Sequence, residues 1–207
     1  MRKPRASSLI RRLGVPLLFL TAALSLVYAL PLVVHSVKAE KAVNEKAGAQ
    51  NSVSEILRDN SILPEAVGRM RAAMLEAAMS GEIEALRVPV EMNEIPPMIA
   101  KEKISDPVAY WTKISGDGQG REIMAIIVEL FRTGFVRKAA GTDDEMYVWP
   151  YFAEIPLDKL TPAQEVELLT LVTPDQLKAM RASGKYDHYR IGIAHDGTWH
   201  FFWNGVQ

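Results

Sequence analysis

The chain begins with a basic segment followed by a long apolar run. The first 12 residues hold five basic side chains and no acid, and residues 13–34 then continue for 22 residues without a charge. At a rise of about 1.5 Å per residue, a helix of this length is roughly 33 Å long, enough to cross a hydrocarbon core of about 30 Å. The pattern predicts a transmembrane anchor over residues 13–35, with residues 13–34 in the lipid bilayer.

Charge gives this anchor an orientation. Basic residues stay on the cytoplasmic side, so residues 1–12 are expected in the cytoplasm and the C-terminal part in the bacterial periplasm. Val37-Lys38-Ala39 resembles a cleavage site, and the alternative is secretion to the periplasm after cleavage near Ala39. The apolar run exceeds the ~7–15 residues of ordinary signal peptides, which favours a retained anchor in the inner membrane.

Beyond the anchor, the hydrophobic pattern separates a stalk from a domain. Residues 36–60 are polar, with apolar positions too sparse for a continuous helical stripe, and they predict a partly helical stalk. Residues 61–207 form the predicted periplasmic domain. Its first helix starts at Pro64 and ends before Gly81. Its apolar stripe consists of Val67, Met70, Met74 and Ala78.

N-cap residues, prolines and apolar periodicity predict four more helices. Asp106-Pro107 opens one, and residues 122–132 carry the most apolar one. Thr161 and Thr173 each begin a Thr-x-x-Gln capping box with proline at the first helical position. Three prolines interrupt residues 87–99, which are predicted to be an irregular loop with apolar side chains directed inward.

Two-residue periodicity predicts two hairpins. Residues 135–139 and 146–152 flank the polar loop GTDDE. In the C-terminal hairpin, a three-residue His195-Asp196-Gly197 loop pairs Ile193 with Trp199. This register gathers one apolar face from Tyr189, Ile191, Ile193, Trp199, Phe201 and Trp203. The expected fold is α+β, with helices on a small antiparallel sheet of about four strands, covered mainly on one face.

Charge and composition exclude several classes of function. The net charge of −1 combines +5 in residues 1–35 with −6 in the remainder. The exported part is therefore acidic and has no basic stripe, which disfavours nucleic-acid binding. The chain has no cysteine, which rules out a disulfide framework, a thiol nucleophile and a zinc–thiolate site.

Histidines and glycines suggest sites that their spacing does not support. In the predicted register His188 and His200 are staggered by four residues, or roughly 13 Å, too far apart to share an ion, and His195 lies in the turn. The GDGQG run at residues 116–120 follows a helix and lacks the Gly-Lys-Ser/Thr of a phosphate loop, so it is interpreted as a helix connection. We expect no metal and no cofactor.

Aromatic and acidic residues supply the candidate ligand site. Tyr147, Trp149 and Tyr151 alternate on one side of a strand that Pro150 marks as an edge, with Glu154 close by. Such rows stack on sugar rings or apolar ligands, or else they pack as core beneath helices. Both interpretations stay open, because the domain also needs large apolar side chains for its core.

Acids elsewhere provide an enzymatic alternative. Glu91, Glu94 and Glu154 are candidates for glycoside hydrolysis at the envelope, although no spacing fixes two of them across a cleft. Asp143-Asp144-Glu145 is predicted to be a solvated loop tip.

Three segments carry a resemblance. GEIEAL, EMYVWPYFAEIPLDKLTPAQEVELL and DGTWHFFWNG together resemble a family of uncharacterised bacterial exported or membrane-anchored proteins, over most of residues 62–204. The helix, the Gly-Glu-x-Glu-Ala-Leu turn and the late hairpin are also loosely similar to nuclear-transport-factor-like α+β domains. The first resemblance implies a shared fold and transfers no catalytic residue.

The sequence therefore favours a membrane-tethered periplasmic module that binds an envelope protein or glycan. The alternatives are an envelope hydrolase that uses carboxylates and a structural subunit of an envelope assembly.

N-terminal sequencing of the mature protein tests the retained anchor. Because the apolar run is longer than a signal peptide, we expect the N-terminus to precede residue 13. An N-terminus at Glu40 would instead establish cleavage after Ala39.

Overall fold

The computed structural model describes residues 55–205, so the predicted anchor and most of the predicted stalk lie outside the described residues. No helix within residues 55–205 is long and apolar enough to cross a bilayer. The predicted α+β class is confirmed for this part of the chain.

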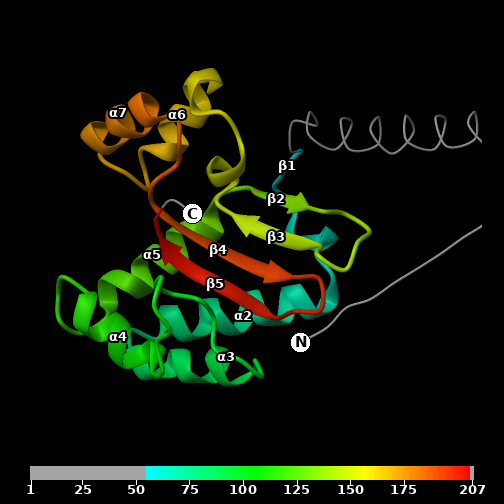
Figure 1. Ribbon diagram of the computed structural model, residues 1–207, viewed down its shortest axis with the longest axis vertical. Helices are drawn as coiled ribbons and strands as arrows, with labels where there is room; N and C mark the ends of the chain where they lie inside the picture. Colours follow the sequence, from blue (N-terminus) through cyan, green and yellow to red (C-terminus); the bar gives the residue numbers. More distant parts are fainter. Residues whose placement is uncertain (1–54, 206–207) are drawn as a thin grey trace, which may run out of the picture. The chain divides into compact units, whose positions relative to one another are not determined.

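A single antiparallel sheet organises the described residues. Its five strands follow one another in chain order, with β1 at one edge and β5 at the other (Figure 1). The strands are β1 (Ile56–Leu57), β2 (Phe135–Lys138), β3 (Met146–Trp149), β4 (Tyr189–Ala194) and β5 (Trp199–Asn204).

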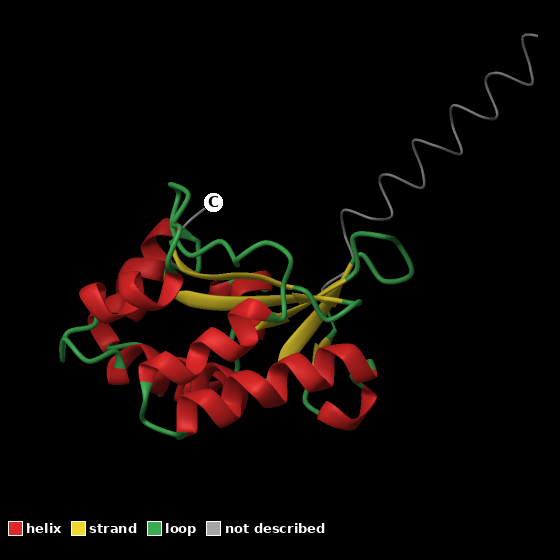
Figure 2. Cartoon of the chain, turned by 90° about the horizontal axis from the view of Figure 1, so that it is seen from below, coloured by secondary structure: helices red, strands yellow, loops and turns green. Residues whose placement is uncertain are grey.

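Helices lie between β1 and β2 in the chain and also separate the two hairpins (Figure 1). The α-helices are α2 (Glu65–Met79), α3 (Arg87–Glu91), α4 (Pro107–Ile114), α5 (Arg121–Arg132), α6 (Pro162–Leu168) and α7 (Pro174–Ser183). Short 3-10 helices are η1 (Asn60–Ile62), η2 (Ile83–Leu86), η3 (Tyr151–Glu154) and η4 (Leu157–Lys159). Figure 2 shows the strands with a layer of helices beneath them.

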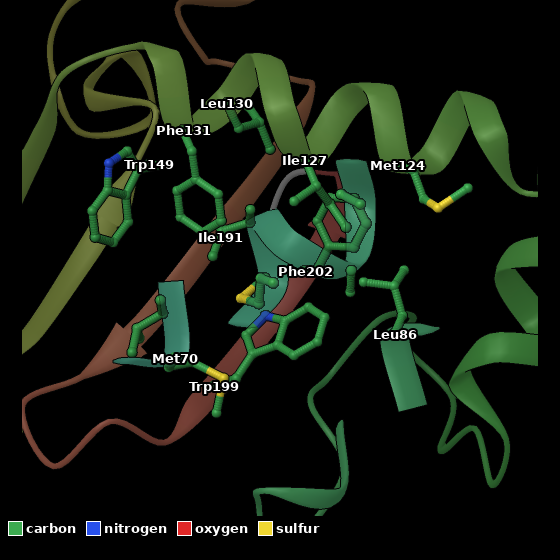
Figure 3. Packing of buried hydrophobic residues seen from close by; sticks show 14 of the residues in the cluster. Met70, Leu86, Met124, Ile127, Leu130, Phe131, Trp149, Ile191, Trp199 and Phe202 are labelled. Carbon is green, nitrogen blue, oxygen red and sulfur yellow. The ribbon is translucent and has the colours of Figure 1, made fainter. Parts of the chain in front are cut away.

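The largest apolar cluster lies between the sheet and helices α2–α5. Figure 3 shows Trp199, Phe202 and Ile191 from the strands among side chains of the helices. Trp111 of α4 stacks on Trp199 with ring centroids 5.6 Å apart and an interplanar angle of 21°. Trp111 and Trp199 are fully buried, and they anchor this core through their large apolar area.

A second cluster covers the opposite face. Val136 of β2 and Val148 of β3 point into it, and residues from η3, η4, α6 and α7 close it. The expectation of one mainly covered face is therefore wrong. Alternate residues of β2 and β3 are apolar on both sides, as in a sheet buried between two layers.

The predicted helix starts are confirmed. Asp106 Oδ1 accepts a hydrogen bond from the Ala109 amide at 3.1 Å and caps α4. Thr161 and Thr173 both form complete capping boxes, before α6 and α7. Each such cap contributes roughly 1 kcal/mol to its helix.

The sheet has one strand more than predicted. Ile56–Leu57, expected to belong to the stalk, pairs antiparallel with β2 and forms an edge strand. A two-residue strand is too short to show a two-residue periodicity, so the pattern could not reveal it. Gly134, just before β2, allows β1 to lie close to this part of the chain. A Cβ at this position would lie 2.9 Å from the Leu57 carbonyl oxygen.

Two other local expectations are wrong. Residues 87–91 form helix α3 instead of an irregular loop, and Pro89 is tolerated because it lies in the first turn. Strand β3 is central, between β2 and β4, and Pro150 follows its last residue instead of marking an edge.

The C-terminal turn is as predicted, but the strand beyond it is not. Ile193 pairs with Trp199, and the Ala194 amide donates to the Thr198 carbonyl at 2.9 Å. An extra residue at His200 then forms a β-bulge, so Gly192 opposes Phe201. Phe202 joins the buried face with Ile191, and Phe201 packs on the second cluster instead.

A neighbouring segment explains the bulge. The Met98 amide donates to the His200 carbonyl at 2.8 Å, and the Phe202 amide donates to the Met98 carbonyl at 3.0 Å. Residue 98 thus pairs with the outer edge of β5 in a parallel bridge. The sequence pattern contains no signal for this contact between residues about a hundred positions apart.

Replacing Gly192 tests how closely the bulged strand packs. A Cβ at this position would lie 2.4 Å from the Phe201 ring and 2.9 Å from Met146 Sδ. Gly192→Ala should therefore lower the free energy of unfolding by about 1–3 kcal/mol, measured by urea titration of the purified chain.

Gly68→Ala is the matched control. Gly68 lies in α2, and a Cβ added there would have no other atom within 4 Å, so alanine should raise the free energy of unfolding by roughly 0.5–1 kcal/mol. An equal stability of the Gly192→Ala variant and the wild type would contradict the packing derived for Phe201.

Candidate functional site

The predicted aromatic candidates lie in the core. Tyr147 and Trp149 belong to the cluster beneath α2–α5, whereas Tyr151 belongs to the second cluster, and they are 3%, 0% and 0% exposed. The Glu154 carboxylate forms an ion pair with Lys138 at 2.9 Å. The structure therefore does not bring these four residues together in one pocket, and protein atoms cover the three rings.

Glu145 forms the most highly connected charged cluster. Its carboxylate accepts hydrogen bonds from Arg137 at 2.6 Å, the Gly141 amide at 2.6 Å and the Tyr147 hydroxyl at 2.9 Å. His195 Nδ1 lies 3.0 Å from the same carboxylate. Arg137 and the Gly141 amide hold the pKa of Glu145 well below its usual range, against the effect of burial, and Tyr147 and His195 add to the lowering.

This cluster is a clamp between two hairpins. Glu145 follows the β2–β3 loop, His195 lies in the β4–β5 turn, and the His195 amide also donates to the Glu145 carbonyl at 3.0 Å. The predicted solvated tip is thus wrong for Glu145, which is 3% exposed. A carboxylate with a strongly lowered pKa stays ionised and is unsuited to donate a proton as a general acid.

A second clamp holds β1. Arg58 donates two hydrogen bonds to the Glu167 carboxylate, at 2.8 and 2.6 Å, and the Tyr151 hydroxyl donates to it at 2.8 Å. Burial raises the pKa of Glu167, but the bonds from Arg58 and Tyr151 outweigh it and lower the pKa overall. The arrangement ties the segment after β1 to helix α6.

The remaining acids and histidines do not converge. Glu91 and Glu94 are exposed, and within residues 55–205 no group of three or more acids, histidines or cysteines is placed to hold a metal ion. His188 is half-buried, and burial lowers its pKa despite the nearby Asp187. His200 is exposed at the bulge.

The side chain of Asp117 forms hydrogen bonds within the glycine-rich connection. Asp117 accepts hydrogen bonds from the Gln119 and Arg121 amides at 3.1 and 3.2 Å and from the Ser115 hydroxyl. The donors that a phosphate would need are thus partly used within the loop. This agrees with its interpretation as a connection between α4 and α5.

Two clefts flank residues 95–104, which we name the crossing segment because they pass the edge of β5. The first cleft has a volume of about 470 Å³ and lies at the start of β5. Its apolar wall includes Ile95, Met98, Ile104 and Trp199, with His200 at the rim. Met98 anchors the segment between the clefts through its backbone bonds to β5.

The second cleft lies at the other end of β5 and also has a volume of about 470 Å³. It is lined by Tyr110 of α4, Tyr189 of β4 and Trp203 of β5, together with the polar side chains of Lys101, Glu102 and Asn204. Residues 99–102 line both clefts. Both volumes fall within the range of about 300–1,000 Å³ that is typical of ligand pockets.

Asn93 fixes the approach to the first cleft. Its side-chain amide donates to the Trp199 carbonyl at 2.9 Å and accepts from the Trp199 amide at 3.0 Å. The side chain thereby pairs with the strand edge as a neighbouring strand would. The Asn93 side chain and the Met98 backbone thus bond to β5 at successive residues.

Exposed apolar side chains accumulate on this part of the chain. Val88 and Met92 are 63% and 50% exposed, and Ile95 and Met98 are 73% and 39% exposed. All four lie within eleven consecutive residues. Contiguous exposed apolar surface marks interaction sites, and of these four residues Ile95 and Met98 line the first cleft.

Sequence reasoning missed both clefts. The prolines of residues 87–99 indicate a loop, and nothing in the pattern indicates that this part of the chain pairs with β5. No known protein family, curated protein or solved structure matches the chain. The resemblances inferred from the sequence therefore stay predictions.

Glu145→Gln tests the clamp through its pH dependence. Because the folded-state pKa is lowered, the stabilisation by ionised Glu145 is fully present above about pH 4.5 and is lost as the pH falls through the acid range. The variant should be about 2 kcal/mol less stable than the wild type at pH 7, and this difference should shrink at pH 3.5. Urea titrations at both pH values measure it.

Asp144→Asn is the control, because its side chain is exposed beside Glu145. It should match the wild type at both pH values. A Glu145→Gln deficit that is the same at pH 7 and pH 3.5 would show that the charge of Glu145 is not its source.

Proposed function

We propose that the chain is a membrane-tethered periplasmic module that binds an apolar segment of another envelope protein in the first cleft. The anchor is residues 13–34, with residues 1–12 in the cytoplasm. The basic N-terminal segment and the uncharged run support this placement. The observation that carries the binding role is the apolar cleft and the exposed side chains beside it.

The first cleft and the first described strand lie at opposite edges of the sheet. The chain enters the described residues at β1, and the crossing segment lies along β5, at the opposite edge (Figure 1). Four strand spacings of about 4.8 Å separate these edges by roughly 19 Å. The proposed binding face and strand β1 are thus on different sides of the sheet.

The chemistry of the cleft suits a protein segment. Ile95 and Met98 supply adaptable apolar contacts, and a methionine side chain can fit partners of irregular shape. Each exposed apolar side chain that becomes buried contributes about 25 cal/mol per Å² of area removed from water. The proposal requires a different protein as the partner. Binding of a second copy of this chain in the cleft would contradict it.

The enzymatic alternative has less support. A hydrolase that uses two carboxylates needs them across one cleft, with one pKa raised for the acid role. Glu145 and Glu167 instead have lowered pKa values and are held by arginines. Glu91 and Glu94 are exposed, and Glu154 is paired with Lys138.

Site-specific photocrosslinking in intact cells tests the proposal. With p-benzoylphenylalanine at Ile95, we expect a discrete adduct in the membrane fraction whose second component is one other protein, identified by mass spectrometry. Met98→Asp in the same chain should reduce the adduct at least tenfold, because a charge enters the apolar wall.

The control places the same photoreactive residue at Val166 of α6, which is 67% exposed. No matching adduct is expected there. Adducts of equal yield at both positions, none at Ile95, or one with the mass of two copies of the chain would each refute the proposal.

A further inference from the structure

The second cleft combines aromatic walls with polar side chains at its rim. Tyr110 and Tyr189 are half-buried and line the cleft, and Trp203 contributes to the lining beside them. Lys101, Glu102 and Asn204 are exposed beside these rings. This cleft shares residues 99–102 with the first one, but its aromatic side chains have no part in the protein-binding role proposed there.

Two of the three aromatic rings, those of Tyr189 and Trp203, are held by neighbouring groups. Tyr189 packs on Phe202 with ring centroids 5.0 Å apart, and His188 meets its ring edge-on at 5.5 Å. Trp203 Nε1 donates a hydrogen bond to the Gly205 carbonyl at 2.8 Å. A ligand therefore meets walls that are already ordered, so little conformational entropy is lost when it binds.

Polar groups converge on the same place. Tyr189 and Asn204 are paired across β4 and β5, and Tyr110 of α4 lines the same cleft. The side chains of Tyr110, Tyr189 and Asn204 therefore contribute to one cleft lining. Hydroxyls and an amide offer both donors and acceptors within one small area.

We propose that the second cleft binds a pyranose oligosaccharide. A sugar ring has an apolar face of C–H groups, which packs on aromatic rings, and a rim of hydroxyls, each a donor and an acceptor. Tyr110 and Tyr189 provide the rings, and Asn204 provides an amide for the rim.

The charged side chains that line the cleft favour a neutral ligand. Lys101 and Glu102 are adjacent and opposite in charge, so the cleft carries no net charge from its lining acids and bases. A phosphorylated or strongly acidic ligand gains nothing from such a pair, whereas a neutral oligosaccharide can use one side chain as donor and the other as acceptor.

Calorimetric titration of the full-length chain tests the site. The chain is purified in lauryldimethylamine oxide, whose headgroup contains no sugar, and titrated with tri-N-acetylchitotriose and, separately, with maltotriose. The two probes distinguish an acetamido sugar, as in wall glycan, from a plain glucose oligomer. Saturable binding of either one, with a change in tryptophan fluorescence, supports the site.

Variants locate the binding in this cleft. Tyr110→Ala should weaken binding at least tenfold because the stacking ring is lost, and Asn204→Ala should also weaken it. Tyr110→Phe keeps the ring and should retain more affinity than Tyr110→Ala. Lys103→Ala is the control, because Lys103 lines the first cleft and not the second.

Folding is checked by the thermal transition of each variant. Failure of both probes to bind the wild type at millimolar concentration would overturn the proposal, as would unchanged affinity in a folded Tyr110→Ala variant. Neither outcome bears on the photocrosslinking from Ile95, so the two proposals can fail separately.

Discussion

Strand β5 pairs with β4 on one side and with Met98 on the other, and the rest of the described structure depends on this double pairing. An extra residue at His200 lets the backbone satisfy both partners. Because a one-residue slip exchanges the two faces of a strand, the bulge sends Phe201 to one core and Phe202 to the other. It also places the crossing segment against the sheet edge.

The outer edge of β5 is covered by Asn93 and Met98 instead of being open to solvent. An open edge strand presents unpaired backbone groups that can pair with other chains. Met98 and the Asn93 side chain occupy the outer edge of β5 at Trp199, His200 and Phe202. Asn93 and Met98 thereby block pairing with another chain through the backbone of β5 at these residues.

Two carboxylates stabilise parts of the fold that have few backbone bonds of their own. Glu145 joins the long β2–β3 loop to the turn at His195, and Glu167 joins the residue after β1 to α6. Both carboxylates have lowered pKa values, so both clamps are expected to weaken in acid. Their charge therefore serves structure, which argues against an acid–base role for either.

The sequence by itself determined the local elements whose signals are short in range, while only the tertiary structure decided the site. The stripe that starts after Pro64, the caps at Asp106, Thr161 and Thr173, and the turn at Gly197 depend on side chains within a few residues of each other, so spacing alone reveals them. The anchor at residues 13–34 depends on length and hydropathy, and it stays a prediction.

The strand β1, the bulge at His200 and both clefts instead depend on contacts between residues far apart in the chain. Glu145 is likewise polar in sequence and buried in the fold, and one of its partners, His195, lies 50 residues away. Periodicity records which side chains avoid water, but it cannot identify the distant group that each one meets.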